Sequence, residues 1–271
     1  MAAQRRAIRF REWLLRGIAL IFIVALLGLS AGVIWLLTPQ VLLPEATAAM
    51  VSDQTVTVVP SEAEISFTPS VDTRNTALIV YPGAKVPVEG YAPLARSIAE
   101  HGFRVFLVPM PGNFALLAVE RALAVQTAHA DVAHWVIAGH SLGGVAAAQF
   151  AAQHPDSIHG LALWASFPND DLSQRDLQVL SVWGALDSAR DSMDSAQTRA
   201  RLPADTRFVE IPGGNHEQFG YYTGQANDPV AEITRADQQA QIVAATVELL
   251  EAVEAAAGRR DLVRGTRLWL P

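Results

Sequence analysis

The sequence predicts an α/β fold, a mainly parallel twisted sheet with helices on both faces, preceded by one transmembrane helix. Between residues 56 and 258, short apolar runs alternate with segments of helical periodicity, a pattern that builds a parallel sheet. Hydrophobic residues make up 51% of the chain, which is sufficient for a packed core. The N-terminal part stands apart, because residues 17–44 contain no charged side chain.

Residues 17–37 form an apolar run long enough to cross a bilayer, since about 20 helical residues span its hydrocarbon core. Five arginines in the basic segment 1–16 predict a cytoplasmic N-terminus and an extracytoplasmic domain. A cleaved signal peptide is the alternative, but its apolar region is normally about 7–15 residues with a small-residue site close behind. Here the Ala-x-Ala site at 46–48 lies well past the run, which favours an uncleaved single-pass anchor.

The remaining elements follow in order after a predicted linker at 38–54. Residues 56–60 and 64–69 should pair as antiparallel strands at a sheet edge. Further strands are predicted at 76–83, 103–109, 134–139, 160–166, 177–184 and 206–213, and helices at 90–101, 114–128, 142–153 and 234–258. Gly258 should end the last helix. The predicted domain therefore covers 55–258 and is followed by a basic tail at 259–271.

Charge and composition exclude several classes of function. The chain carries a net charge of −7, and because both ends are basic, residues 17–258 carry −14. An acidic body argues against a nucleic-acid partner, since phosphate contacts need clustered cations. The chain contains no cysteine, which excludes a disulfide framework, a thiolate metal site and a cysteine nucleophile.

The stretch Gly139-His140-Ser141-Leu142-Gly143 joins a predicted strand to a predicted helix. A G-x-S-x-G sequence at such a junction is typical of a serine nucleophile held on a sharp turn. Larger residues at the two glycines would collide with the neighbouring strand and helix. The helix N-terminus adds partial positive charge that stabilises an oxyanion. Ser141 is therefore the predicted nucleophile, and a glycine-rich packing turn is the alternative.

A serine hydroxyl becomes reactive only when a base takes its proton and an acid orients that base. In this strand order the acid and then the base should follow the serine, on loops after later strands. Asp187 and His216 each come directly after a predicted strand. They are the predicted acid and base. Asp191 and Asp194, on a segment expected to be a solvated helix, are alternatives for the acid.

The loop "YPGAK" follows the third predicted strand and contains Lys85, the chain's one lysine. In this arrangement the backbone N–H groups of that loop and of the residue after the serine form an oxyanion hole. Leu142 and Ala84 are the predicted donors, with Lys85 as the next candidate. Lys85, Asn113 and Phe219 are candidate pocket residues. A plain packing or solvent-exposed role remains open for each of these three.

Five stretches of the sequence carry a resemblance: "YPGAKVPVEGYAPLA", "VPMPGN", "GHSLGG", "WGALDS" and "GGNHEQFGYYTGQ". Across about residues 72–256 the chain resembles the α/β-hydrolase superfamily, and more narrowly the short, lidless bacterial group called alpha/beta hydrolase family 5, or dienelactone-hydrolase-like. The resemblance implies an α/β-hydrolase fold with Ser141, Asp187 and His216 as the catalytic triad. Dienelactone hydrolases proper use a cysteine nucleophile, which argues against that activity here.

The connection at 167–176 is too short for the helical lid that many relatives insert there. We therefore expect an open, shallow site suited to small or surface-presented esters. The sequence predicts a membrane-anchored, carboxylesterase-like serine hydrolase that acts on a small-molecule ester through an acyl-enzyme, without a metal or organic cofactor. The alternatives are an envelope acyltransferase or thioesterase with the same triad, and a catalytically silent binding protein of the same fold.

Overall fold

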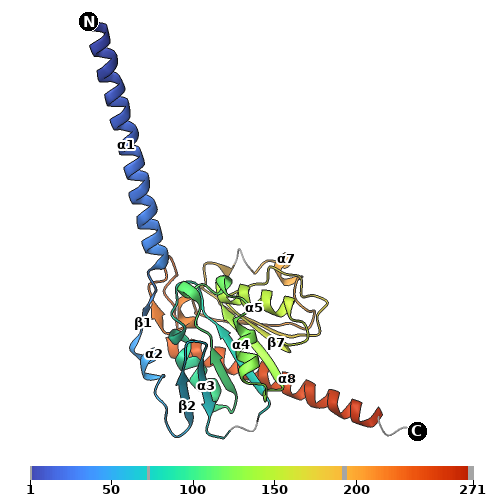
Figure 1. Ribbon diagram of the computed structural model, residues 1–271. Helices are drawn as coiled ribbons and strands as arrows, with labels where there is room; N and C mark the ends of the chain where they lie inside the picture. Colours follow the sequence, from blue (N-terminus) through green and yellow to red (C-terminus); the bar gives the residue numbers. More distant parts are fainter. Residues whose placement is uncertain (1, 72–73, 191–193, 268–271) are drawn as a thin grey trace. The chain divides into compact units, whose positions relative to one another are not determined.

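The computed structural model describes residues 2–71, 74–190 and 194–267. The chain divides into two compact units, Met1–Pro39 and Gln40–Pro271 (Figure 1). The first unit is one helix, α1 (Ala2–Leu37). Within it, Leu15–Leu37 is long and apolar enough to cross a membrane, because helices of about 20 apolar residues match the bilayer core. This stretch contains the predicted span 17–37.

The second unit is built on an eight-stranded sheet within the described residues, with the strand order β2-β3-β5-β4-β6-β7-β8-β9. β3 pairs antiparallel with β2 and β5, and the other neighbours pair in parallel. The predicted antiparallel edge pair and the mainly parallel sheet are therefore confirmed. The strands are β2 (Val56–Pro60), β3 (Ile65–Pro69), β4 (Thr76–Tyr81), β5 (Arg104–Leu107), β6 (His134–His140), β7 (Gly160–Trp164), β8 (Gln178–Gly184) and β9 (Arg207–Ile211).

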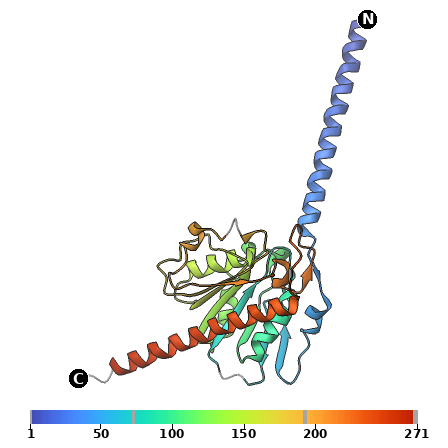
Figure 2. The ribbon, with the colours of Figure 1, turned by 180° about the vertical axis from the view of Figure 1, so that it is seen from behind.

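Helices cover both faces of this sheet, as Figures 1 and 2 show from opposite sides. α3 (Ala92–Glu100) and α8 (Arg235–Arg267) pack on one face. α4 (Arg121–Ala128) and α5 (Leu142–Gln153) pack on the other. The central strand β4 is buried throughout, because its side chains alternate between the two hydrophobic clusters. Its unbroken apolar run in the sequence follows from this double burial.

Part of the predicted linker at 38–54 belongs instead to the second unit, which begins at Gln40. There β1 (Val41–Leu42) pairs antiparallel with β10 (Tyr222–Thr223). The short helix α2 (Pro44–Ala48) follows and buries Ala46 completely. Pro44 is the first residue of this helix, a position at which proline is favoured.

The last helix also differs from its prediction. α8 continues through Gly258 to Arg267, so the predicted helix end at Gly258 is wrong, and residues 259–267 are helical. The φ angle of Gly258 lies outside the left-handed region, and no atom lies within 4 Å of its Cβ position. An interior glycine lowers helix stability by about 1 kcal/mol relative to alanine but does not by itself end a helix.

Glycines allow β6 and α5 to meet closely at the predicted turn. A Cβ atom at Gly139 would overlap the backbone C and O atoms of Gly143. We expect Gly139→Ala to lower the free energy of unfolding by more than about 3 kcal/mol, because backbone would have to move. Gly258→Ala, in open space, should raise it by up to about 1 kcal/mol. Urea denaturation of both variants in one detergent measures this, and equal stability of the two would contradict the packing.

Candidate active site

The strand order of the sheet reverses between β4 and β6. The chain runs from β4 outward to β5 and then returns to β6 on the other side of β4. At such a point, the loops after the two strands diverge. Ligands of open α/β sheets bind there, beside the carboxyl ends of the strands. The loop 82–85 follows β4 and Ser141 follows β6. The two sequence-predicted parts therefore flank the expected binding point.

Ser141 lies on the turn between β6 and α5, with φ 52° and ψ −124°. Residues other than glycine rarely adopt this region, so the surrounding structure must hold the turn. The Ser141 N–H donates to the carbonyl of Trp164 at 2.9 Å. Its carbonyl accepts the N–H of Gly144 at 2.9 Å and the hydroxyl of Ser166 at 2.6 Å. These bonds fix the backbone, and across the described part of the chain the Ser141 hydroxyl itself makes no hydrogen bond.

Asp187 and His216 lie in the loops after β8 and β9 and contact each other. His216 Nδ1 is 2.6 Å from Asp187 Oδ2, and the two side chains are 9% and 0% exposed. Asp187 Oδ1 accepts the N–H of Ala189 at 2.9 Å. A carboxylate at Nδ1 keeps the proton on that nitrogen and leaves Nε2 as the proton acceptor. The structure therefore joins the predicted acid to the predicted base.

The alternative acids do not share this position. Asp194 pairs with Arg199, with Oδ1 2.7 Å from Nε, just before the short helix α7 (Ala196–Arg199). Asp191 lies outside the described residues. Of the acids described, Asp187 is the one that hydrogen-bonds the ring of His216.

The rings around His140 connect the base to the turn of Ser141. The centroid of the His140 ring is 4.6 Å from that of His216. Because His140 directly precedes Ser141, this contact puts His216 beside the turn. In the described residues, no hydrogen bond joins Ser141 to His216. Such catalytic hydrogen bonds are often long in unliganded enzymes and shorten when substrate binds.

Phe219, a candidate pocket residue, lies on the core side of His140. Its ring stacks on that of His140 at 5.3 Å between centroids and 8° between planes. The side chain is fully buried within the hydrophobic cluster that includes α3 and α8. It therefore supports His140, which favours the packing role that the sequence left open over a role as a pocket wall.

Tyr91 links the turn to the loop after β4, a role that the sequence did not reveal. Its hydroxyl accepts the N–H of Gly83 at 2.9 Å and lies 2.8 Å from His140 Nδ1. The hydroxyl hydrogen can then point to Nδ1, which makes His140 a neutral ring with its proton on Nε2. Burial, and secondly the charge of nearby His216, lower the pKa of His140 well below its usual value.

The buried neutral His140 should make folding sensitive to acid. Below about pH 6.5 the unfolded chain protonates this histidine while the folded chain does not. The free energy of unfolding is therefore highest above that pH and falls on acidification, by at most about 1.4 kcal/mol per pH unit. We expect His140→Gln to show a shallower loss than wild type in urea titrations between about pH 7 and pH 5. His101→Gln, at an exposed position, is the control, and a wild-type slope in His140→Gln would contradict the assignment.

The predicted oxyanion donors Ala84 and Leu142 lie in the loop after β4 and at the first position of α5. Among the described residues, neither of their N–H groups donates a hydrogen bond. The N–H of Lys85, the other candidate donor, is bound to the carbonyl of Asn113 at 2.9 Å. Lys85 and Asn113, both half-buried, are therefore in contact at this loop, and within the described residues the N–H of Ala84 is left without a hydrogen-bond acceptor.

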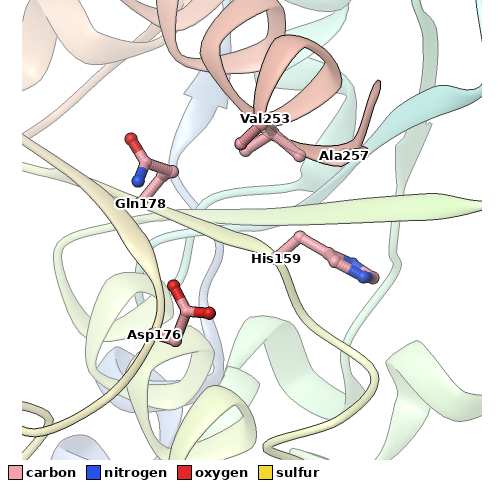
Figure 3. A pocket seen from close by; sticks show the side chains of 6 residues that line it. His159, Asp176, Gln178, Val253 and Ala257 are labelled. Atoms are coloured by element: carbon pink, nitrogen blue, oxygen red, sulfur yellow. The ribbon is translucent and has the colours of Figure 1, made fainter. Parts of the chain in front are cut away.

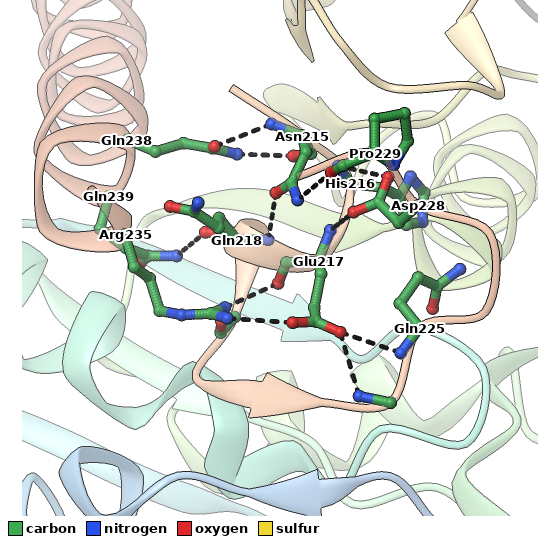
Figure 4. A network of polar contacts seen from close by, with 12 residues as sticks. Asn215, His216, Glu217, Gln218, Gln225, Asp228, Pro229, Arg235, Gln238 and Gln239 are labelled. Atoms are coloured by element: carbon green, nitrogen blue, oxygen red, sulfur yellow. Dashed lines mark hydrogen bonds and ion pairs between the residues drawn. The ribbon is translucent and has the colours of Figure 1, made fainter. Parts of the chain in front are cut away.

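Polar contacts with α8 hold the loop that carries His216 (Figure 4). Gln238 accepts the N–H of Asn215 at 3.0 Å and donates to its carbonyl at 2.7 Å. Arg235 donates to the carbonyl of Glu217 at 2.9 Å and pairs with its carboxylate at 3.2 Å. The residues on both sides of His216 are therefore fixed to the same helix.

Asp228 is a second carboxylate at this loop, and no sequence motif marks it. Its Oδ1 accepts the N–H of His216 at 3.2 Å, and its Oδ2 accepts the N–H of Glu217 at 2.8 Å (Figure 4). Burial raises the pKa of Asp228, against the opposing effect of these two hydrogen bonds. Asp228 thus holds the backbone of His216, whereas Asp187 holds its ring.

A separate hollow lies at the amino ends of β7 and β8, away from these residues (Figure 3). His159, Asp176, Gln178, Val253, Ala256 and Ala257 line it. Its volume of about 20 Å³ holds roughly one water molecule. The hollow is therefore too small for an organic substrate.

Comparison with known proteins adds sequence and fold relationships. Residues 77–240 match the profile described as the alpha/beta hydrolase family. A stretch of 82 residues is 39% identical to the pimeloyl-(acyl-carrier protein) methyl ester esterase of Chromobacterium violaceum. This match covers 29% of the present chain and 32% of the esterase, so the chain spans about a third of the length of that relative.

Two solved structures share the fold at low sequence identity. An esterase from Mycobacterium tuberculosis superposes with a TM-score of 0.53 at 15% identity, over 76% of this chain and 95% of that one. A dienelactone hydrolase from Anabaena variabilis superposes with a TM-score of 0.51 at 16% identity, over 69% of this chain and 91% of that one. At these identities the likeness is one of fold.

Proposed function

Because the chain belongs to the alpha/beta hydrolase family, we propose that it is a membrane-anchored serine hydrolase that cleaves carboxylic ester-like bonds. The esterases among its neighbours support an esterase-like hydrolase. The observation that carries the proposal is the buried Asp187–His216 pair, 2.6 Å apart, beside the strained turn of Ser141. Fold alone would not carry it, since one fold hosts many chemistries.

In the proposed reaction, the Ser141 hydroxyl oxygen attacks the ester carbonyl carbon while His216 Nε2 takes its proton. Asp187 holds the ring and stabilises the imidazolium. The N–H groups of Leu142 and Ala84 donate to the oxyanion of the tetrahedral intermediate. The intermediate collapses to the acyl-enzyme, and the alcohol leaves with the proton from His216. Water, activated by the same base, then releases the acid and restores Ser141.

The neutral His140 suits this mechanism. Its ring lies 4.6 Å from that of His216, and His216 becomes positively charged in each transfer step. A second charge at that distance would disfavour the imidazolium, because like charges a few ångströms apart repel strongly inside a protein. Burial, and secondly the charge of His216, lower the pKa of His140 and so favour its uncharged form, whose Nδ1 can accept the hydroxyl of Tyr91.

The connection between β7 and β8 supports the choice of substrate. Residues 165–177 contain no helix, and all of them lie within the described chain. Without a lid over it, the site suits small or surface-presented esters. The three side chains can complete this chemistry by themselves.

Two features support the anchor and its orientation. Leu15–Leu37 has the length and composition of a membrane span. Five arginines precede it, and basic residues remain on the cytoplasmic side of single spans. We therefore infer a single-pass protein with a cytoplasmic N-terminus and an extracytoplasmic catalytic domain.

The proposed reaction is tested by measuring the products that the chain forms from p-nitrophenyl butyrate. The full chain in detergent should release nitrophenolate in an initial burst equal to the amount of enzyme, because acylation of an activated ester precedes slower hydrolysis. In the steady state, butyrate and nitrophenolate should appear in equal amounts. Butyrate transferred to an added alcohol or thiol instead of water would contradict hydrolysis and indicate an acyltransferase.

A further inference from the structure

The residues directly after α1 bind both loops of the proposed active site. We call residues 40–43 the strap. The Gln40 N–H donates to the carbonyl of Lys85 at 2.8 Å, in the loop that carries the proposed oxyanion donor Ala84. The Leu43 N–H donates to the carbonyl of Tyr221 at 3.0 Å, in the chain that follows His216. Between these bonds, β1 pairs with β10.

The strap also lies close to the apolar helix along the chain. Only Thr38 and Pro39 separate Gln40 from Leu37, the last residue of the apolar stretch Leu15–Leu37. A fully extended chain advances at most about 3.6 Å per residue, so Gln40 is within roughly 11 Å of Leu37. If α1 is the membrane anchor of the proposed function, the loop that Gln40 binds lies near the bilayer surface. The present inference rests on that anchor.

Exposed apolar side chains border the loop 82–85, which carries the proposed oxyanion donor Ala84. Val41, in the strap, is 65% exposed, and Leu117 is 70% exposed. Leu117 ends the short turn η3 (Ala115–Leu117), which follows Asn113, the residue bound to the N–H of Lys85. Two apolar side chains therefore stand on segments that are hydrogen-bonded to this one loop.

A third exposed apolar side chain borders the loop that carries His216. Val230 is 90% exposed. It follows Pro229, whose carbonyl accepts the side-chain amide of Asn215 at 2.8 Å, and Asn215 directly precedes His216. We call Val41, Leu117 and Val230 the apolar rim.

Exposure alone does not identify a membrane contact, since single exposed apolar residues are common. Val71 is 72% exposed and lies just beyond β3, at the amino ends of the parallel strands, because Phe67 pairs with Val105 near the start of β5. The chain connection distinguishes the rim from Val71. The rim residues lie on segments that are hydrogen-bonded to the two loops, and the strap that binds these loops follows the apolar helix in the chain, whereas Val71 lies at the opposite end of the sheet.

We propose that the apolar rim rests in the bilayer that holds α1 and that the site takes its ester from this membrane. Apolar side chains gain free energy when they enter the headgroup and acyl boundary. The ester groups of acylated lipids lie at that depth, and an open site without a lid can receive them there. Water is added across the acyl C–O bond, which yields a fatty acid and the deacylated lipid.

Contact with the membrane can be measured without any activity. Because the chain contains no cysteine, Leu117→Cys and Val71→Cys each accept one environment-sensitive fluorophore at one position. We expect brominated acyl chains in phosphatidylcholine vesicles to quench the probe at position 117 in the full reconstituted chain and to leave the probe at 71 unquenched. Equal quenching at the two positions, or none at 117, would overturn the docking.

Substrate choice is tested by comparing two esters. In the same vesicles, the ratio of long-chain diacylglycerol hydrolysis to p-nitrophenyl butyrate hydrolysis should fall roughly tenfold in Leu117→Glu, because a charge opposes insertion of the rim. Val71→Glu should keep the wild-type ratio, and equal ratios in the two variants would overturn the lipid substrate. If position 117 is quenched but the wild type cleaves neither ester, the proposed function fails while the docking stands.

Discussion

Replacement of Ser141 by alanine should lower kcat/KM for p-nitrophenyl butyrate by about a millionfold, because loss of the nucleophile disables all three side chains as a unit. Only the small rate enhancement from binding and the oxyanion donors should remain. The variant should fold as the wild type does. The turn is held through the backbone of Ser141, which Trp164, Gly144 and Ser166 bind. Steady-state kinetics of the full chain in detergent measure the loss.

Ser166→Ala is the matched control for this prediction. Ser166 is a buried serine next to the turn, and its hydroxyl donates to the carbonyl of Ser141 at 2.6 Å. Its loss removes one hydrogen bond to the backbone, worth about 1 kcal/mol, so we expect less than about a tenfold change in kcat/KM. A Ser141→Ala variant that is no less active than Ser166→Ala would refute the assignment of Ser141 as the nucleophile.

Replacement of Asp187 by asparagine should lower kcat by about 10⁴-fold, with the shape of the site retained. An amide in place of the carboxylate can donate to Nδ1 of His216, which leaves the proton on Nε2, where the serine proton must go. It also removes the charge that stabilises the imidazolium. The side chain of Asp187 is fully buried, so no solvent can take its place. The pre-steady-state burst and kcat of the variant measure the effect.

Asp194→Asn is the control, because it makes the same chemical change at the alternative acid. Asp194 pairs with Arg199, and the two side chains are 12% and 49% exposed. Loss of such a partly exposed pair should lower the free energy of unfolding by about 1 kcal/mol. We expect kcat to stay within about threefold of wild type. A large loss in Asp194→Asn with an active Asp187→Asn would show that the acid had been assigned to the wrong residue.

The sheet could be predicted because its signals are local. A strand buried on both faces must be apolar throughout, and β4, β6, β7 and β8 each show an unbroken buried run beyond the first residue. The glycines at 139 and 143 and the strand-to-helix change identified the turn of Ser141. Asp187 and His216 could be proposed because each comes shortly after a strand and the chain order expected of a triad limits the choice.

The strap and α8 could not be predicted in the same way. β1 and β10 are two residues each, too short to show any periodicity, and their pairing joins residues far apart in the chain. Gly258 carries a signal that usually ends a helix, but no residue there adopts the left-handed conformation that such an end requires. The helix α8 continues to Arg267 despite Gly258 and Gly265, because the helix formers around these two glycines can outweigh their cost.

The polar partners of the site were missed for a related reason. Tyr91 and Asp228 act on backbone N–H groups in other loops, at Gly83, His216 and Glu217. Neither side chain has a spacing relative to its partner that a strand or helix would impose. Their roles become visible only when tertiary structure brings the loops together.

Covalent labelling by a fluorophosphonate tests the central claim most directly, because the reagent reacts with a serine activated by its base. We predict one adduct on the full-length wild type, located at Ser141 by peptide mass spectrometry, and no adduct on Ser141→Ala. Labelling should be much slower in Asp187→Asn. An unlabelled wild type, or an adduct that persists in Ser141→Ala, would contradict a serine hydrolase built on Ser141, Asp187 and His216.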